Sequence, residues 1–203
     1  MSRIRVKICG VRDEATVDCA AQAGCDFLGV VFVRSSPRFV EPTDAVRLAA
    51  ASADAGAVPV AVVRLPLEAA ARAALEAFPI VQFHGEESAE DLVAFRAWEC
   101  WKGLRFSTAA AAEWLASKRV ARIVVDGPDA GSGEGWEHAE LTRLDPALRA
   151  RCLLAGGLHA GNVAGAVRAA RPWGVDVSSG VESARGVKDH ARIRAFIEAA
   201  REA

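Results

Sequence analysis

Short apolar runs alternate with longer alanine-rich segments along the whole chain. The runs are rich in β-branched residues, as strands are, whereas the alanine-rich segments space their apolar positions as helices do. The pattern predicts strands over Arg5–Cys9, Phe27–Val33, Val58–Val63, Ile80–Phe83, Cys100–Leu104, Arg122–Asp126, Arg151–Ala155 and Val175–Ser178. It predicts helices over Asp13–Ala23, Thr43–Ala53, Leu67–Phe78, Ser88–Trp98, Ser107–Ser117, Asn162–Arg171 and Asp189–Arg201, with a glycine-bearing loop and a weak helical segment after the sixth strand.

Eight strand–helix units in 203 residues are about 25 residues each, the lower end of what a (β/α)8 barrel needs. Near-continuous apolar strands such as Leu28–Phe32 suit parallel strands covered on both faces. A doubly wound open sheet would alternate in the same way, but its G-x-G-x-x-G turn is missing after the first strand, where the chain reads Cys9–Gly10–Val11–Arg12. We therefore predict an α/β fold with one domain over residues 1–203, a single (β/α)8 TIM barrel with parallel strands. Thr43, Ser88 and Ser107 are the expected caps at three helix starts.

Composition narrows the class of protein. Apolar residues make up 52% of the chain and charged residues 25%, with 25 basic and 26 acidic side chains. The high apolar fraction excludes a disordered chain. Because basic and acidic side chains are nearly equal in number, the chain has no excess positive charge to bind nucleic acid or an anionic membrane. The N-terminal residues show no leader-like apolar segment, and no run of eighteen apolar residues predicts a membrane helix. The five cysteines are irregularly spaced without C-x-x-C, which argues against disulfides or zinc. We expect a cytoplasmic monomer or homodimer that binds a small molecule.

Two glycine-rich turns follow the last two predicted strands. Gly156–Gly157 comes after the seventh strand, and Ser178–Ser179–Gly180 comes after the eighth. Glycines there let backbone N–H groups converge on an anion, although tight strand-to-helix turns also favour glycine. Because the active site of such a barrel lies at the carboxyl ends of its strands, often with phosphate bound after strands seven and eight, we expect a phosphate site here.

Cys9 ends the first predicted strand, where it faces the expected pocket. Lys7, two residues earlier, should also point into the barrel and favour the thiolate. A lone cysteine is more often a small core residue, which is our interpretation of Cys19, Cys25, Cys100 and Cys152. Both a functional and a structural role therefore stay open for Cys9.

Further polar residues lie at other strand ends. Asp126 closes an otherwise apolar strand before a loop with Gly131–Ser132–Gly133, which has the freedom to close over a ligand. A carboxylate inside a barrel is costly if unpaired, so Asp126 either caps the loop or does acid–base work. Arg38 follows the second strand. It is either a solvated surface residue or a residue whose planar guanidinium binds a carboxylate through two N–H groups. His84, after the fourth, is either a structural hydrogen-bonding group or a catalytic one.

Taken together, these segments resemble the phosphoribosylanthranilate isomerase family, the cofactor-free isomerase of tryptophan biosynthesis. The similarity runs in order from Lys7 to about Asp189. It is carried by Lys7-Ile8-Cys9-Gly10, Ser36-Pro37-Arg38, Val81-Gln82-Phe83-His84-Gly85, Val125-Asp126 with Gly131-Ser132-Gly133, Leu154-Ala155-Gly156-Gly157-Leu158 with Asn162-Val163, and Asp176-Val177-Ser178-Ser179-Gly180-Val181-Glu182.

The resemblance implies a TIM barrel and an aldose–ketose (Amadori) rearrangement of N-(5-phospho-β-D-ribosyl)anthranilate to 1-(2-carboxyphenylamino)-1-deoxy-D-ribulose 5-phosphate. It implies Cys9 as general base, Asp126 as general acid and Arg38 on the anthranilate carboxylate. The other substrate-binding residues expected on this basis are His84, Gly156, Gly157, Asp176, Ser178, Ser179 and Gly180. No metal and no cofactor are expected.

Two segments depart from the family pattern. Val11-Arg12-Asp13 follows Gly10 where Ile-Thr or Leu-Thr is common, and Glu134-Gly135-Trp136-Glu137-His138 stands where an aromatic residue followed by Asp-Trp is usual. These differences leave the first helix cap and the loop geometry open.

Two rival interpretations remain. One is another phosphosugar-converting TIM barrel, such as an indole-glycerol-phosphate synthase or a sugar-phosphate isomerase or epimerase. The synthase needs a catalytic lysine and glutamates at strand ends, and the predicted strand ends show no such set. A metal-dependent epimerase needs several histidine and aspartate ligands, for which only His84 and Asp126 are candidates. The other is a non-catalytic barrel that binds a phosphorylated metabolite, although such a protein has no use for an acid–base pair.

Overall fold

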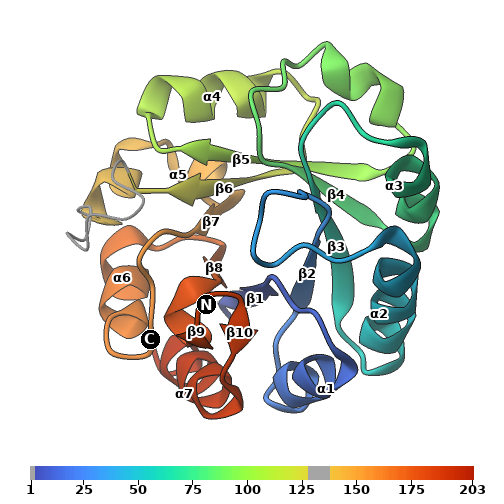
Figure 1. Cartoon of the computed structure of the whole chain (residues 1–203). Coiled ribbons are helices and arrows are strands. Elements are labelled where there is room, and N and C mark those ends of the chain that lie inside the picture. Colours follow the sequence, from blue (N-terminus) through green and yellow to red (C-terminus); the bar gives the residue numbers. More distant parts are fainter. Residues whose placement is uncertain (1–2, 128–137) are drawn as a thin grey trace.

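A closed barrel of eight parallel strands forms the centre of the molecule, with helices around it (Figure 1). The structure is a computed structural model and describes residues 3–127 and 138–203. The strands pair in sequence order, and the eighth pairs with the first, where Lys7 lies opposite Asp176. The predicted (β/α)8 TIM barrel is thus confirmed.

The barrel strands are β1 (Arg5–Cys9), β2 (Phe27–Val31), β3 (Val58–Val63), β4 (Ile80–Phe83), β5 (Glu99–Arg105), β6 (Arg122–Asp126), β7 (Cys152–Leu154) and β8 (Gly174–Val177). The α-helices are α1 (Glu14–Gln22), α2 (Pro42–Asp54), α3 (Ala69–Ala74), α4 (Thr108–Ala116), α5 (Pro146–Arg149), α6 (Val163–Ala170) and α7 (His190–Arg201). Short 3-10 helices are η1 (Leu75–Ala77), η2 (Asp91–Phe95), η3 (His138–Arg143) and η4 (Ser179–Val181). Most predicted strands and helices agree with these bounds to within two residues.

The predicted helix over Ser88–Trp98 is wrong, because this segment forms only the 3-10 helix η2. Two side chains in its C-terminal part make contacts with other elements. The Phe95 ring packs edge-on against Phe83 in the barrel wall at 4.8 Å, and the Trp98 indole N–H donates to the Leu75 carbonyl at 3.0 Å. These tertiary contacts override the local helical preference. The predicted helix over Leu67–Phe78 is likewise shortened to α3 followed by η1.

The helix starts show which caps form. Asp13 accepts a hydrogen bond from the Thr16 N–H at 2.8 Å, so the departure from the family pattern still supplies a cap for α1. Ser107 caps α4 as predicted, at 3.2 Å from the Ala110 nitrogen. Thr43 is not a cap: α2 already begins at Pro42, because proline suits the first helical position, where an N–H has no partner in any case.

The barrel interior changes from apolar to polar along its axis. Near the amino ends of the strands the Phe27, Trp101 and Trp173 rings pack together, with centroids 5.0 to 6.1 Å apart. Above them Lys7 and Asp176 form a buried ion pair at 2.9 Å. The polar end faces the loops that follow the strands, so the fold places the side chains that the sequence predicts for the site at one mouth of the barrel.

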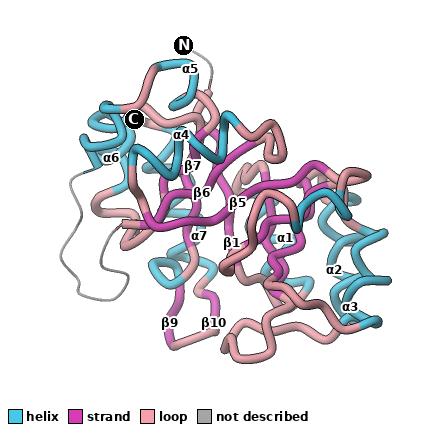
Figure 2. Tube along the Cα trace, turned by 90° about the horizontal axis from the view of Figure 1, so that it is seen from above, coloured by secondary structure: helices cyan, strands magenta, loops and turns pink. Residues whose placement is uncertain are grey.

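A small antiparallel hairpin, which the sequence pattern does not predict, follows η4. It consists of β9 (Glu182–Ala184) and β10 (Val187–Lys188). Figure 2 shows it projecting at the end of the molecule opposite the two chain termini. All five cysteines are free thiols. No helix within the described residues is long and apolar enough to cross a membrane.

Candidate active site

One cavity of about 600 Å³ opens at the carboxyl ends of the barrel strands. Side chains and turns from most of the strands line it, and it brings together every residue that the sequence predicts for the site. These are Cys9, Arg38, His84, Asp126, Gly156, Gly157, Asp176, Ser178, Ser179 and Gly180. Cys9 and Asp126, from β1 and β6, therefore face one space rather than two.

The Cys9 thiol lies among charged groups at the end of β1. A Cβ atom on Gly29 would lie 3.0 Å from Cys9 Sγ and 3.2 Å from Lys7 Nζ, so both atoms face this glycine of β2. Burial raises the pKa of Cys9, and the Asp176 carboxylate adds to that effect. Lys7 and Lys188 act in the opposite direction without overcoming it. Lys7 thus favours the thiolate as predicted, but burial keeps the resting residue a thiol.

Lys7 is fully buried, and its ammonium is paired with Asp176. Burial opposes the charge, but the carboxylate of Asp176 outweighs this effect and raises the pKa of Lys7 above its usual value. A permanent positive charge therefore lies below the cavity floor, next to the thiol.

Asp126 lies beside His84, with 3.4 Å between the carboxylate Oδ2 and the imidazole Nε2. On the other side of the ring the Gln82 amide nitrogen is 3.2 Å from Nδ1. An amide N–H can only donate, so in this arrangement Nδ1 accepts and Nε2–H points toward Asp126. His84 is a neighbour of the predicted acid. There is no space for a side chain at position 103, because a Cβ there would lie 2.2 Å from Nδ1.

The two glycine turns close the other side of the cavity. Gly156 and Gly157 both have positive φ, +79° and +65°, which glycine adopts without strain. Gly180 packs so closely against the previous turn that a Cβ would lie 1.8 Å from the Leu158 carbonyl oxygen. η4 starts at Ser179, and the Ser178 side chain makes no capping hydrogen bond to it, so the first N–H groups of η4 have no partner within that helix.

Arg38 reaches the cavity from the loop after β2, but it is already paired. Its Nε and Nη2 atoms donate to the two carboxylate oxygens of Glu182 at 2.6 and 2.8 Å. Lys188 Nζ binds the same carboxylate at 2.9 Å and the Ser178 carbonyl oxygen at 2.9 Å.

Several lining or neighbouring residues had no role in the sequence-based prediction. Glu182 and Gln82 occur within the motifs, so only their function was missed, whereas Lys188 follows the last motif and carries no signal of its own. The Gln82 side chain is buried, and its Oε1 has no hydrogen-bond partner among the described residues. Residues 128–137, which include Gly131–Ser132–Gly133, lie outside the described residues.

The described residues contain no group of three or more His, Cys, Asp and Glu side chains arranged to hold a metal ion. The donor set around the cavity is instead a thiol, a carboxyl beside an imidazole, an arginine and backbone amides. Such groups move protons and bind anions.

Comparison with known proteins identifies the family. The family model described as N-(5'phosphoribosyl)anthranilate (PRA) isomerase matches residues 6–199. The chain belongs to this family. N-(5'-phosphoribosyl)anthranilate isomerase from Bordetella bronchiseptica is 42% identical, over 97% of this chain and 95% of the relative. The isomerase family of tryptophan biosynthesis that the motifs resemble is thereby confirmed.

Solved structures agree with the sequence comparison. TrpF from Jonesia denitrificans superposes with a TM-score of 0.84 at 38% identity, covering 98% of this chain and 97% of the other. A phosphoribosyl anthranilate isomerase in complex with reduced 1-(o-carboxyphenylamino)-1-deoxyribulose 5-phosphate superposes with a TM-score of 0.78 at 30% identity, covering 98% and 100%.

Proposed function

We propose that this isomerase converts N-(5-phospho-β-D-ribosyl)anthranilate to 1-(2-carboxyphenylamino)-1-deoxy-D-ribulose 5-phosphate, with Asp126 as general acid and Cys9 as general base. The observation that carries the proposal is the shared cavity: Cys9 and Asp126 line it together with both glycine turns. The reaction is an intramolecular aldose–ketose isomerisation and takes place without a cofactor.

The first step opens the furanose ring. Asp126 donates a proton to the ring oxygen, the bond between that oxygen and C1′ breaks, and the nitrogen lone pair forms a protonated C1′=N Schiff base. The acid must hold its proton until the substrate is bound. The His84 imidazole lies beside this group, with Nε2 3.4 Å from Asp126 Oδ2.

The second step moves a hydrogen from C2′. Cys9 as thiolate removes the C2′ proton, and the electron pair neutralises the Schiff base to give an enolamine. The enolamine takes up a proton at C1′ from the Cys9 thiol while its 2′-hydroxyl loses a proton, which returns to Asp126 through solvent. The product is the 2′-ketone, and no atom is gained or lost overall. Lys7 and Lys188 stabilise the thiolate electrostatically. Each acid–base group contributes about 10²- to 10⁴-fold to the rate.

Positioning supplies the rest of the acceleration. The phosphate binds the turns at Gly156–Gly157 and Ser178–Gly180, and Arg38 binds the anthranilate carboxylate at the other end. Between these anchors, Asp176 lies near the sugar. The unpartnered Gln82 Oε1 is an acceptor for a sugar hydroxyl, because a buried oxygen without a hydrogen bond is costly until a ligand supplies one.

The test is turnover of the unstable substrate, generated in situ and followed by loss of anthranilate-type fluorescence with metals chelated. We expect Cys9→Ser and Asp126→Asn each to lower kcat at least about 10²-fold while the melting temperature is kept. Arg38→Ala should chiefly raise KM. Near-normal rates in both acid–base variants would contradict the mechanism.

The same assay separates the rival functions. A non-catalytic phosphometabolite-binding barrel would bind the substrate without turnover. Another phosphosugar-converting barrel would leave the anthranilate fluorescence unchanged and act on a different sugar phosphate. Size-exclusion chromatography with light scattering tests the expected monomer or homodimer.

A further inference from the structure

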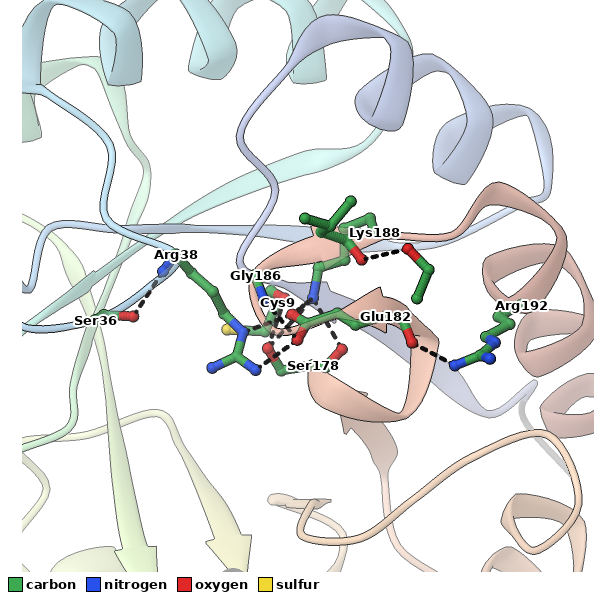
Figure 3. A network of polar contacts seen from close by, with 10 residues as sticks. Cys9, Ser36, Arg38, Ser178, Glu182, Gly186, Lys188 and Arg192 are labelled. Atoms are coloured by element: carbon green, nitrogen blue, oxygen red, sulfur yellow. Dashed lines mark hydrogen bonds and ion pairs between the residues drawn. The ribbon is translucent and has the colours of Figure 1, made fainter.

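The Arg38 guanidinium forms hydrogen bonds to Glu182 along one of its edges. Glu182 binds the edge formed by Nε and Nη2, with both carboxylate oxygens engaged at 2.6 and 2.8 Å, as Figure 3 shows. A guanidinium has five N–H bonds in a plane, and this side-on pairing uses two of them. Within the described part of the chain no acceptor binds Nη1. The second edge, Nη1 with the remaining Nη2 hydrogen, stays open beside the cavity that Arg38 lines.

Glu182 is itself fixed from two further directions. The Gly186 N–H donates to one carboxylate oxygen at 3.0 Å, and Lys188 Nζ donates to the other at 2.9 Å. The side chains of Glu182 and Lys188 are only 4% and 3% exposed. Burial alone would raise the pKa of Glu182, but Arg38, Gly186 and Lys188 lower it to about 2, so the carboxylate stays charged. The β9–β10 hairpin thus presents a rigid anion to Arg38 (Figure 3).

The stem of Arg38 is also constrained. It crosses Gly10 so closely that a Cβ there would lie 2.5 Å from Arg38 Cδ. Long arginine side chains lose much rotamer freedom when they are ordered. Here the protein itself has already imposed this order, because the stem is confined at Gly10 and the head is held by Glu182. A ligand that binds the open edge does not have to order the side chain again.

We propose that Glu182, held in place by Lys188, is a positioning residue that turns the open edge of Arg38 toward the substrate carboxylate and thereby sets the preference for a carboxylated aromatic ring. The inference rests on the proposed function of the cavity. Glu182 does not touch the substrate. It acts through Arg38, and the hairpin that carries it is a specificity element rather than only a connection between β8 and α7.

The experiment compares two ligands that differ only in the carboxylate. One is reduced 1-(o-carboxyphenylamino)-1-deoxyribulose 5-phosphate, and the other is the same compound made from aniline. Calorimetry gives the ratio of their Kd values for the wild type and for Glu182→Gln, which keeps the size but removes the charge. We expect the wild type to prefer the carboxylated ligand by about 10- to 100-fold, as for a charge-assisted pair. In Glu182→Gln this ratio should fall at least about 5-fold, while the Kd of the aniline compound stays within about 3-fold.

Three further variants separate positioning from a general effect on folding. Glu182→Asp keeps the charge and should recover part of the ratio. Glu182→Gln/Lys188→Met removes both buried charges and leaves neither of them unpaired. The Kd ratio can therefore be measured in this double variant if Glu182→Gln alone is unstable. Glu68→Gln is the matched control, because Glu68 binds Arg34 in the same side-on way, at 2.8 and 2.8 Å, on the exposed surface. It should leave the ratio unchanged.

The outcomes distinguish this inference from the proposed function. If the wild type binds neither ligand and does not turn over the substrate, the proposed function fails. If the wild type prefers the carboxylated ligand and Glu182→Gln keeps or increases that preference, Glu182 is a competitor or a bystander, and the positioning role is overturned. Equal binding of both ligands by the wild type would also overturn it.

Discussion

The electrostatics around Cys9 show how single residues decide chemistry at this site. Two buried ammonium groups, those of Lys7 and Lys188, favour the thiolate, yet burial and the Asp176 carboxylate leave the pKa of Cys9 raised. A resting thiol resists oxidation and alkylation, because the thiolate is the nucleophile. The proposed base is thus protected until the pH, or a charge that develops in the bound substrate, favours loss of its proton.

This balance predicts the alkaline behaviour of Cys9. Its iodoacetamide alkylation, measured by mass spectrometry across pH, should have a midpoint above that of an ordinary thiol. kcat/KM should also increase as the pH rises, as the alkylation rate does, because the proposed base acts in its deprotonated form. Lys188→Met removes a positive charge near the sulfur and should move the midpoint to still higher pH.

Arg96→Met, which removes an exposed cation outside the cavity, is the control and should leave the midpoint unchanged. A wild-type midpoint below that of a free thiol, or no shift in Lys188→Met, would contradict this view of the site.

At the scale of elements, the turns after β7 and β8 act as one unit. Gly180 at the start of η4 contacts the Leu158 carbonyl, and Gly156 contacts the backbone at Gly127 after β6, where a Cβ would lie 2.7 Å from the Gly127 nitrogen. Neither contact leaves room for a side chain. The phosphate end of the proposed site is therefore shaped by backbone packing between turns and not by any one side chain.

Gly180→Ala should accordingly separate the two turns. A Cβ placed 1.8 Å from a backbone oxygen cannot be accommodated without moving η4. We expect KM for the phosphoribosyl substrate to rise at least about 10-fold, with a smaller change in kcat, because binding energy from the phosphate is lost. Steady-state kinetics measure both.

Gly165→Ala is the matched control for this substitution. Gly165 lies within α6, and a Cβ there meets nothing within 4 Å. This variant should keep KM and gain up to about 1 kcal/mol of stability from helix propensity. An unchanged KM in Gly180→Ala would show that the turn does not bind the phosphate.

At the scale of the whole molecule, Asp26 joins the two ends of the chain. Its nearly buried carboxylate accepts hydrogen bonds from the Val6 N–H at 2.8 Å, from Arg5 at 2.7 Å and from Arg201 of α7 at 2.7 Å. Burial alone would raise the pKa of Asp26, but these partners lower it. The contact ties the last helix to β1 and β2 at the end of the barrel opposite the site.

Asp26→Asn should therefore lower the free energy of unfolding by about 2 to 4 kcal/mol at pH 7, because it leaves buried partners unpaired. The folded-state pKa lies below the unfolded one, so this contribution is present above the unfolded value and disappears as the pH falls through the folded value. Urea unfolding at pH 7 and near pH 3 measures the difference, which should shrink in acid.

Asp44→Asn is the surface control, since Asp44 pairs with Arg47 while both side chains are more than half exposed. It should change the free energy of unfolding by less than about 0.5 kcal/mol. An Asp26 effect of the same size would mean that the two ends of the chain are joined by packing alone.

Periodicity predicted the eight strand–helix units, but a doubly wound open sheet has the same pattern. The choice of a barrel also needed the missing G-x-G-x-x-G turn after the first strand. Strands such as Arg122–Asp126 could be assigned to the residue, because an apolar β-branched run flanked by helical spacing has few other solutions. Where tertiary contacts outweigh local preference, prediction failed: η2 replaced a helix because Phe95 and Trp98 bind elsewhere. The β9–β10 hairpin was missed because Glu182 and Lys188 lie in a short polar stretch with no alternating apolar pattern.

The predictions for the site show the same division between what chain order determines and what tertiary contacts decide. Which residues lie at the strand ends follows from chain order, since parallel strands in a barrel present all their carboxyl ends at one mouth. Sequence therefore determined the barrel, its mouth and the candidate acid, base and anion-binding turns. Only the tertiary structure decided that Arg38 meets Glu182, 144 residues away, that His84 lies against Asp126, and that burial outweighs Lys7 at Cys9. Charge pairing and desolvation depend on distances between chain segments, and no local pattern encodes those distances.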